Sequence, residues 1–193
     1  EESRLRMLNA LNDFYIQGVE TSIPLYKTIL KTDEYKNGQL STDFLKRFWI
    51  IDITPDFKLQ YQMIKEYLEE EYHFAGIFLT HSHVGHYSGL LELGLEILNT
   101  SNIPVYVMPE LLKFLKNNAS INFLFQSQNI KSIEIQEDEK IKLSDDLIVS
   151  SFLVPHRNEM SETVGYKIKT KNNSIIYIPD IDAWSDWNTD IIG

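Results

Sequence analysis

The segment Phe78-Leu79-Thr80-His81-Ser82-His83-Val84-Gly85-His86-Tyr87-Ser88-Gly89 holds three of the five histidines of the chain. It begins within the apolar run 76–80, which is typical of a short strand. Because residues i and i+2 of extended backbone point to the same side, we expect His81 and His83 to face one ion and His86 to open a helix. Neutral imidazole binds zinc, iron or manganese and leaves positions open for water or substrate. We therefore predict a metal site; the alternative is a polar loop whose histidines cap the next helix.

Three further strand-like or apolar runs end next to side chains of the types that ligate metals. These are the runs 147–155, 174–179 and 48–51, which lead into His156, Asp180 and Asp52, respectively. The remaining histidine, His73, is expected to be a polar residue near the end of a helix.

The order and strand-end placement of these residues resemble the metallo-β-lactamase superfamily, whose signature is His-x-His-x-Asp-His. The resemblance implies a first metal site formed by His81, His83 and His156. It further implies that Asp180 is shared between two metals and that His86 faces a second or partial site. The expected cofactor is zinc, as one or two ions, with iron or manganese as the alternatives.

The resemblance covers residues 48–190 and implies a mixed α/β fold, the four-layer αββα sandwich, with the metal at one edge of two sheets. Asp52 is then the early acid that braces the site. We expect strands at 104–108, 131–135, 140–143, 147–154, 163–170 and 174–178, and helices at 57–72, at 88–99, from near Pro109 and from near Ile121. In the first of these helices, Leu59, Met63, Tyr67 and Leu68 are expected to face the sheet.

The chain departs from the superfamily signature at Gly85, where an Asp is expected. The second metal thereby loses a ligand. Asp182 lies two residues beyond Asp180 and is a candidate replacement, because this spacing keeps side chains on one side of extended backbone. The alternative is that Asp182 caps a helix beginning near Trp184.

The superfamily also has a last metal-ligand His after the bridging Asp, and no His follows Asp180 in this sequence. The first residue is Glu1, and residues 1–30 have a helical pattern where the superfamily begins with strands. We therefore expect the domain to be incomplete at one or both ends.

Within the superfamily, the wider sequence around the ligands resembles the branch of pyrroloquinoline-quinone biosynthesis protein B and its relatives. The phrases that carry this resemblance are 51–57, 83–90, 154–157 and 178–182, Gly85 included. It implies a small substrate derived from an amino acid or a peptide. It also makes oxidation or hydroxylation at a single iron an alternative to hydrolysis.

Composition limits the remaining classes. The 193 residues carry a net charge of −10 without a block of Lys or Arg, which argues against nucleic acid as a partner. Cys is absent, so any metal depends on His and carboxylate ligands. No apolar stretch is long enough to span a membrane, and no signal sequence is evident. We expect a soluble protein, cytoplasmic, or exported if a signal sequence has been removed. The oligomeric state is left open.

No repeat or linker divides the sequence, so we expect one domain over residues 1–193. Its first part, 1–47, is least like the superfamily and is expected to form a helical insertion or lid; the alternative is a packing helix without contact to substrate. Leu8, Leu11 and Tyr15 share one face of the first helix.

The predicted function is a metal-dependent hydrolase that uses a metal-activated water on a small substrate. Arg157 is a candidate to bind a substrate carboxylate, and Glu159 or Glu162 to act as acid or base. Both glutamates have an alternative role as solvated loop charges, and Tyr87 is expected to pack more than to donate a hydrogen bond. The remaining alternatives are an iron-dependent oxidase or hydroxylase and a metal-binding member that has lost catalysis.

Overall fold

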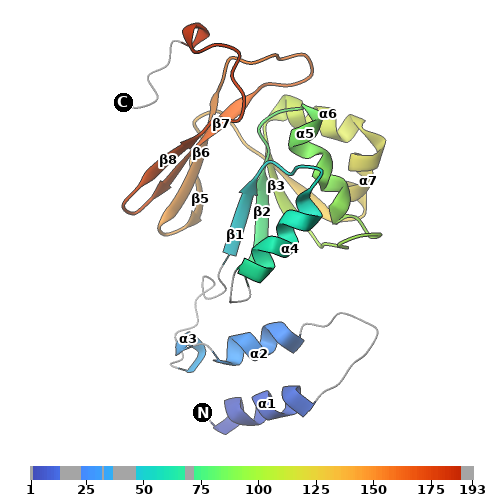
Figure 1. Ribbon diagram of the computed structural model, residues 1–193, viewed down its shortest axis with the longest axis vertical. Helices are drawn as coiled ribbons and strands as arrows, with labels where there is room; N and C mark the ends of the chain where they lie inside the picture. The colour runs from blue at the N-terminus through green and yellow to red at the C-terminus, as the bar shows by residue number, and fades with distance from the viewer. Residues whose placement is uncertain (1, 14–22, 32, 37–46, 68–71, 188–193) are drawn as a thin grey trace. The chain divides into compact units, whose positions relative to one another are not determined.

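The computed structural model describes residues 2–13, 23–31, 33–36, 47–67 and 72–187 (Figure 1). These residues fall into two compact units. The first comprises 1–48 and 62–73, and the second comprises 49–61 and 74–193. The division near residue 48 coincides with the start of the superfamily resemblance, whereas the single-domain organisation stays a prediction.

Among the described residues, the first unit contains three whole helices and the second half of α4 (Phe57–Tyr67). The whole helices are α1 (Glu2–Asp13), α2 (Ile23–Lys31) and α3 (Asp33–Lys36). Leu8 is buried as expected, and the Arg4 guanidinium donates a hydrogen bond of 2.7 Å to the carbonyl of Leu30, which joins α1 to α2. Tyr15 lies outside the described residues.

The first sheet has the strand order β1-β2-β3-β4. Its strands are β1 (Arg47–Ile51), β2 (His73–Phe78), β3 (Ile103–Val107) and β4 (Ile130–Glu134). The β2–β3 and β3–β4 pairs are parallel, with Ile77 opposite Val105 and Tyr106 opposite Ile133. Parallel strands are covered on both faces, which accounts for their apolar composition. His73 begins β2 and is exposed, so its predicted place near a helix end is wrong.

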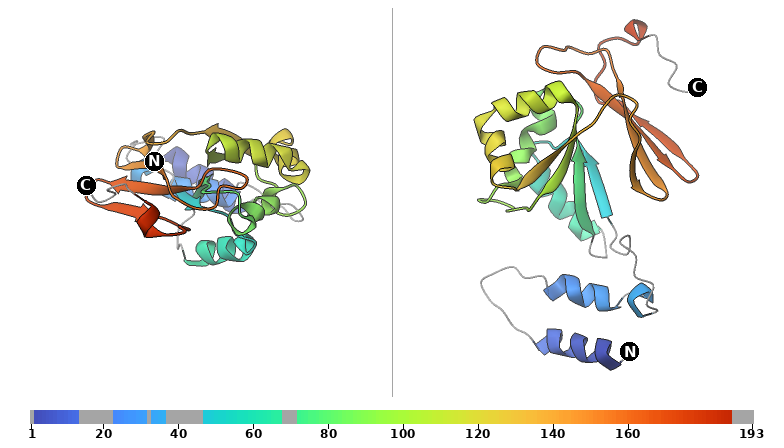
Figure 2. Two further views of the ribbon diagram at one scale, coloured as in Figure 1. Left: turned by 90° about the horizontal axis from the view of Figure 1, so that it is seen from above. Right: turned by 180° about the vertical axis from the view of Figure 1, so that it is seen from behind.

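Helices lie on the face of this sheet that is turned away from the second sheet (Figures 1 and 2). They are α4 (Phe57–Tyr67), α5 (Val84–Tyr87), the 3-10 helix η1 (Ser88–Leu93), α6 (Pro109–Asn117) and α7 (Ala119–Gln126). Pro109 occupies the first turn of α6, where a missing N–H costs nothing. The helix predicted at 88–99 is instead a short 3-10 helix that ends before Gly94.

The face of α4 that packs is not the predicted one. Leu59, Met63 and Tyr67 are exposed, whereas Phe57 is buried and its ring contacts those of Tyr61 and Phe74. Both stripes have the same i, i+4 spacing, so periodicity alone does not choose between them. The stripe with aromatic rings buries more apolar area, and it is the one that packs. Leu68 lies outside the described residues.

The second sheet is antiparallel, with the order β5-β6-β7-β8. Its strands are β5 (Ile141–Ser144), β6 (Leu147–Leu153), β7 (Val164–Thr170) and β8 (Ser174–Tyr177), and the 3-10 helix η2 (Trp184–Asp186) follows. In register, Tyr166 lies opposite both Ser151 and Tyr177. The sequence predicted these strands to within a few residues.

The two sheets pack face to face around one core. Its buried residues are Phe78, Met108, Ile135, Val149, Val164 and Tyr166. The Tyr166 hydroxyl donates a hydrogen bond of 2.5 Å to the carbonyl of Leu79, so a strand of the second sheet contacts the end of β2 directly. The predicted mixed α/β fold with two layered sheets is confirmed. Among the described residues, only η2 is helical after the second sheet, so a full helix layer over that sheet stays a prediction.

Candidate metal centre

The loop that follows β2 is held from both sheets before it reaches His81. Leu79 donates its N–H to the Tyr106 carbonyl at 3.0 Å, and Val164 donates its N–H to the Thr80 carbonyl at 3.1 Å. Thr80 and His81 are almost completely buried, with 0% and 1% exposure. The position of His81 is therefore set by strands of both sheets.

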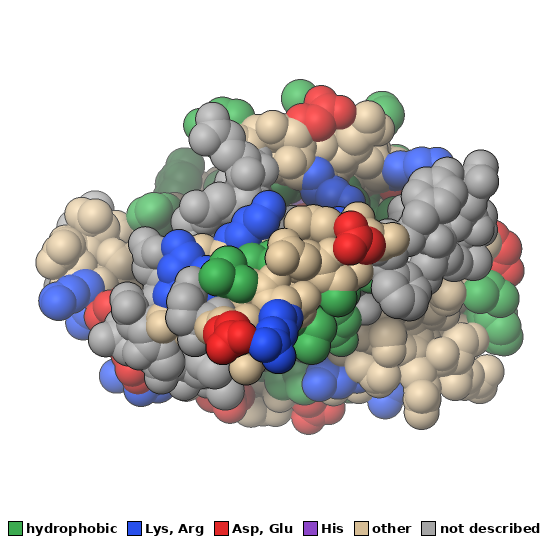
Figure 3. All heavy atoms as spheres, turned by 90° about the horizontal axis from the view of Figure 1, so that it is seen from below, with side chains coloured by type: hydrophobic (Ala, Val, Ile, Leu, Met, Phe, Trp, Pro, Cys, Tyr) green, Lys and Arg blue, Asp and Glu red, His purple; other side chains and the backbone are tan. Residues whose placement is uncertain are grey.

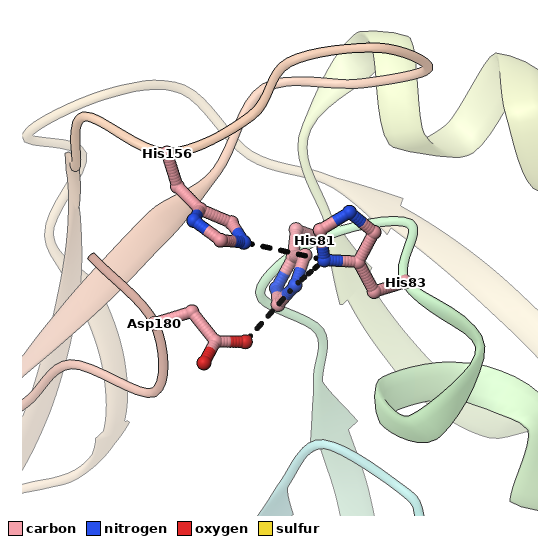
Figure 4. A group of neighbouring side chains, drawn as sticks. All are labelled: His81, His83, His156 and Asp180. Carbon is pink, nitrogen blue, oxygen red and sulfur yellow. Dashed lines mark hydrogen bonds and ion pairs between the residues drawn. The ribbon is translucent and has the colours of Figure 1, made fainter. Parts of the chain in front are cut away.

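Four donor atoms converge at this edge of the sheets, as Figure 4 shows. His83 Nδ1 lies 2.9 Å from His81 Nε2 and 3.2 Å from His156 Nε2. Asp180 Oδ2 lies 3.3 Å from His81 Nε2. All four donor atoms lie within 4.8 Å of one another. The structure thus brings together residues from three separate loops.

The network behind the rings indicates which nitrogens carry protons. The Asp52 carboxylate accepts hydrogen bonds from the N–H and the hydroxyl of Thr80, each at 2.9 Å. The Thr80 hydroxyl has one proton, and it donates this proton to Asp52. Thr80 Oγ1 therefore accepts a hydrogen bond from His81 Nδ1, which is 2.9 Å away. The lone pair of His81 is left on Nε2, which faces the other donors. The sequence offered no signal for this role of Thr80.

His86 is oriented by the same carboxylate. Its Nδ1 donates to Asp52 Oδ2 at 2.7 Å, and its Nε2 lies 3.1 Å from Asp180 Oδ2. The hydrogen bond to Asp52 raises the pKa of His86 above its usual value, and burial acts in the opposite direction. Asp180 therefore lies between His81 and His86, in the position predicted for a shared carboxylate.

His81 is kept neutral. Burial, followed by repulsion from His86 and His83, lowers the pKa of His81 to about 4. Protons therefore compete with a cation for Nε2 only as the pH falls toward 4.

Three of the six distances among the four donor atoms suit a tetrahedral cation. Ligands bound at about 2.1 Å in a tetrahedron lie about 3.4 Å apart. The distances of 2.9, 3.2 and 3.3 Å between neighbouring donor atoms are close to that value. Lone pairs of ring nitrogens and of a carboxylate oxygen that face one another repel without a proton or a cation between them. Three imidazoles and one carboxylate are ligands that zinc accepts.

The structure places Asp182 beside His156. It is not part of the converging donor group. It is also not a helix cap, because Ala183 occupies the N-cap position of η2 without a side-chain hydrogen bond. Its Oδ1 instead lies 2.7 Å from His156 Nδ1. The two-residue spacing from Asp180 did not bring the two carboxylates to one point, because the backbone after β8 is no longer a strand.

Gly85, in α5, offers no ligand to a second metal. A Cβ atom built on it would have nothing within 4 Å, so the position is open. Of the other residues predicted to face a second metal, His86 and Asp180 lie beside each other, with His86 Nε2 3.1 Å from Asp180 Oδ2.

The charged residues of the loop after His156 differ in their surroundings. Arg157 and Glu159 are both exposed. Glu159 Oε2 lies 3.5 Å from His83 Nε2. The pKa of the Glu159 carboxyl is lowered, mainly by a hydrogen bond from its own N–H and less by the neighbouring His83 and Arg157.

The ring of Tyr87 packs edge-on against Phe114, with 5.4 Å between the ring centres, in agreement with the packing role.

Glu162 caps a distant helix instead of facing the donor group. Its two carboxylate oxygens accept the N–H groups of Glu110 and Leu111, each at 3.0 Å, in the first turn of α6. Met108 at the N-cap position has no side-chain cap, so Glu162 supplies the missing acceptor and its charge suits the helix dipole. The acid or base role proposed for Glu162 is therefore replaced by a structural one.

Replacing Glu162 by Ala is expected to lower the free energy of unfolding by about 1–2 kcal/mol, because two N–H groups of α6 lose their acceptor. The midpoint of thermal unfolding of the metal-free protein should fall by about 5 °C. Glu159→Ala, on the same loop and exposed, is the control and should change stability by less than about 0.5 kcal/mol. Equal midpoints for the two variants would contradict the capping role.

A fold of two packed sheets with a His and Asp cluster at their edge defines a class of candidate metalloproteins. Residues 48–191 match the beta-lactamase superfamily domain, so the chain belongs to the beta-lactamase superfamily. Its members are mostly metal-dependent hydrolases, and the donor cluster supports a role of this type.

The fold is similar to that of Zn²⁺-bound PqqB from Methylobacterium extorquens. The TM-score is 0.56 at 24% identity, over 72% of this chain and 47% of that chain. A diphosphatase from the PhnP family has a TM-score of 0.43 at 24% identity, over 62% of this chain and 44% of that chain. The metallo-β-lactamase FEZ-1 from Legionella gormanii has a TM-score of 0.44 at 14% identity, over 66% of this chain and 50% of that chain.

One match to a curated protein is short. Biotin carboxylase 1 from Bacillus subtilis (strain 168) is 35% identical over 48 residues, which are 25% of this chain and 11% of that protein. The chain thus spans a small part of this relative and less than half of PqqB.

Two general expectations concern the surface and membranes. No helix in the described ranges has the length and apolar character needed to cross a bilayer. On the face shown in Figure 3, the described Lys and Arg side chains are interspersed with acidic and hydrophobic ones.

Proposed function

We propose that this protein is a metal-dependent hydrolase of a small substrate. The observation that carries the proposal is the convergence of His81 Nε2, His83 Nδ1, His156 Nε2 and Asp180 Oδ2 within 4.8 Å. Zinc is the proposed ion, because the set contains three imidazoles and one carboxylate. The superfamily membership supports hydrolysis as the reaction type.

Each residue of the site has a distinct task in this proposal. A cation held by His81, His83 and His156 would keep a position open for a water molecule, lower the pKa of that water and polarise the bond to be cleaved. The Asp180 side chain is 38% exposed, so its carboxylate reaches the solvent side and can accept a hydrogen bond from the attacking water. Asp52 orients the site, because its carboxylate accepts hydrogen bonds from Thr80 and His86.

Two exposed charges are proposed to act on the substrate. Arg157 is suited to pair with a substrate carboxylate through its forked guanidinium. Glu159, 3.5 Å from His83, is placed near enough to the donor group to deliver a proton to a leaving group. A substrate derived from an amino acid or a peptide would suit this pair of charges.

Metal content and hydrolysis together test the proposal. Protein purified without chelator would be analysed by elemental mass spectrometry beside Asp180→Ala, and then assayed against a panel of chromogenic carboxyl, thiol and phosphate esters and a β-lactam. We expect bound zinc in the wild type, less in the variant, and chelator-sensitive hydrolysis of at least one compound. Zinc without any hydrolysis across the panel would favour a member that binds metal but has lost catalysis. Metal no higher than in the variant would contradict both enzyme proposals.

A second candidate is a mononuclear iron oxidase or hydroxylase. It is favoured by Gly85, since a second metal lacks the carboxylate that the superfamily signature places there. Three histidines and one carboxylate on a single iron would leave positions for oxygen and substrate. One iron per chain together with oxygen consumption would favour this candidate over the hydrolase.

Replacing Gly85 by Asp is expected to create a fuller second site. A Cβ atom at this position meets nothing within 4 Å, so the Asp side chain has room at its base, and we expect it to join His86 and Asp180 as a third ligand. Metal content should rise by about one ion per chain over that of Gly85→Ala. Gly85→Asn controls for the size of the side chain without its charge, and its metal content should equal that of Gly85→Ala. Equal metal content in the Asp and Asn variants would show that a carboxylate at this position does not reach the second site.

A further inference from the structure

Asp180 and Asp182 lie in one short segment, but their carboxylates contact different histidines. In the segment Pro179-Asp180-Ile181-Asp182, Asp180 Oδ2 faces His81 Nε2 at 3.3 Å. Asp182 Oδ1 instead lies 2.7 Å from His156 Nδ1, which is the ring nitrogen turned away from the donor group. The His156 side chain is only 7% exposed and that of Asp182 is 46% exposed. The first carboxylate is therefore a candidate ligand, and the second lies behind a ligand.

We infer that Asp182 is a positioning residue that fixes the proton of His156 on Nδ1 and so directs the lone pair of Nε2 toward His83. This inference rests on the proposed metal site. In a neutral imidazole either nitrogen can carry the proton, and the hydrogen bond made by one nitrogen decides the state of the other. A carboxylate only accepts, so the nitrogen facing Asp182 is the protonated one.

The backbone keeps Asp182 beside His156. The N–H of Asp182 donates to the carbonyl of Pro155 at 3.0 Å. Asp182 is therefore bonded to the ring of His156 through its side chain and to the preceding residue through its backbone. These two bonds connect the loop after β6 to the turn after β8. The His156 ring then stands almost perpendicular to the rings of His81 and His83, at 87° and 86°. A rotated ring would turn Nε2 away from His83.

The effect of Asp182 should be confined to one ring. His81 has its own acceptor in the Thr80 hydroxyl, and His86 has one in Asp52. Neither of these contacts involves Asp182. Loss of Asp182 should thus weaken the site through His156 while the tautomers of the other two rings are unchanged.

Variants of Asp182 test the inference by two independent measurements. The first is the affinity for zinc, measured by competition with a chromophoric chelator. The second is the tautomer of His156 in the metal-free protein, read from long-range ¹H–¹⁵N correlations of the imidazole. Removing a carboxylate that orients a metal-bound histidine typically weakens metal affinity 10- to 100-fold. We expect a loss of this size in Asp182→Ala, with protonated Nε2 appearing at His156, and a smaller loss in Asp182→Asn, which retains a neutral acceptor.

Asp186→Asn is the matched control. This nearby exposed carboxylate accepts a hydrogen bond from the Ser185 hydroxyl and is not part of the donor group, so its replacement should change neither measurement. The inference is overturned if Asp182→Ala keeps both the wild-type zinc affinity and the Nδ1–H tautomer. The tautomer measurement needs no metal and no substrate. A wild-type protein that binds no zinc would therefore refute the proposed function, while the tautomer shift would still decide the role of Asp182.

Discussion

Replacing His81 by Ala is expected to lower zinc affinity about 100- to 1,000-fold. Four-ligand zinc sites bind their ion with about 10–16 kcal/mol, so each ligand contributes about 3–4 kcal/mol. His81 is 1% exposed and its Nε2 lies 2.9 Å from His83 Nδ1, so the substitution removes one ring nitrogen from the centre of the donor group. Affinity would be measured by competition with a chelator, and activity should fall in proportion to bound metal.

His73→Ala is the matched control for this prediction. His73 is exposed, lies at the start of β2 and is not part of the donor group. Its removal should leave zinc affinity and stoichiometry unchanged. If both variants bind zinc like the wild type, the ion is held elsewhere and the proposed centre is wrong.

Replacing Asp52 by Ala is expected to reduce both stability and zinc affinity. The substitution leaves the buried Thr80 N–H and hydroxyl and the His86 Nδ1–H without their acceptor. Each unsatisfied buried donor costs about 1–3 kcal/mol, so we expect a loss of about 3–5 kcal/mol in the free energy of unfolding. For a chain of this length the midpoint of thermal unfolding should fall by about 10 °C. Zinc affinity should fall about 100-fold, because two rings lose their orientation.

Backbone conformation requires its own controls, since Asp52 has a φ of 59°. Asn tolerates this conformation and keeps one acceptor oxygen, so Asp52→Asn should lose about half as much stability. Asp138 is exposed and has a φ of 60°, so Asp138→Ala measures the backbone effect by itself, about 1 kcal/mol. An Asp52→Ala variant no less stable than Asp138→Ala would show that the hydrogen bonds of Asp52 contribute nothing.

The local pattern of the sequence was sufficient for the elements that carry the site. The run before His81 predicted β2, and the runs before His156 and Asp180 predicted β6 and β8 to within a few residues. Strand alternation and apolar runs depend on neighbours in the sequence, so they can be recognised without the fold. The resemblance to the superfamily then related residues from separate loops, which their spacing alone could not do.

Only the tertiary structure decided what several of these side chains contact. Glu162 caps α6, 51 residues away from Leu111 in the sequence, and Asp182 bonds the ring of His156 instead of capping a helix. The packing face of α4 was likewise settled by the rings of Phe57 and Phe74.

The sequence by itself determined the residue types, their strand ends and the superfamily, because periodicity and motif spacing are local properties of the chain. The tertiary structure decided which acceptor meets which donor, because those pairs form between loops that approach one another only when the two sheets pack. Asp52 shows the difference. Its place after β1 is evident from the sequence, whereas its hydrogen bonds to Thr80 and His86 exist only because β1 lies beside β2 in the folded sheet.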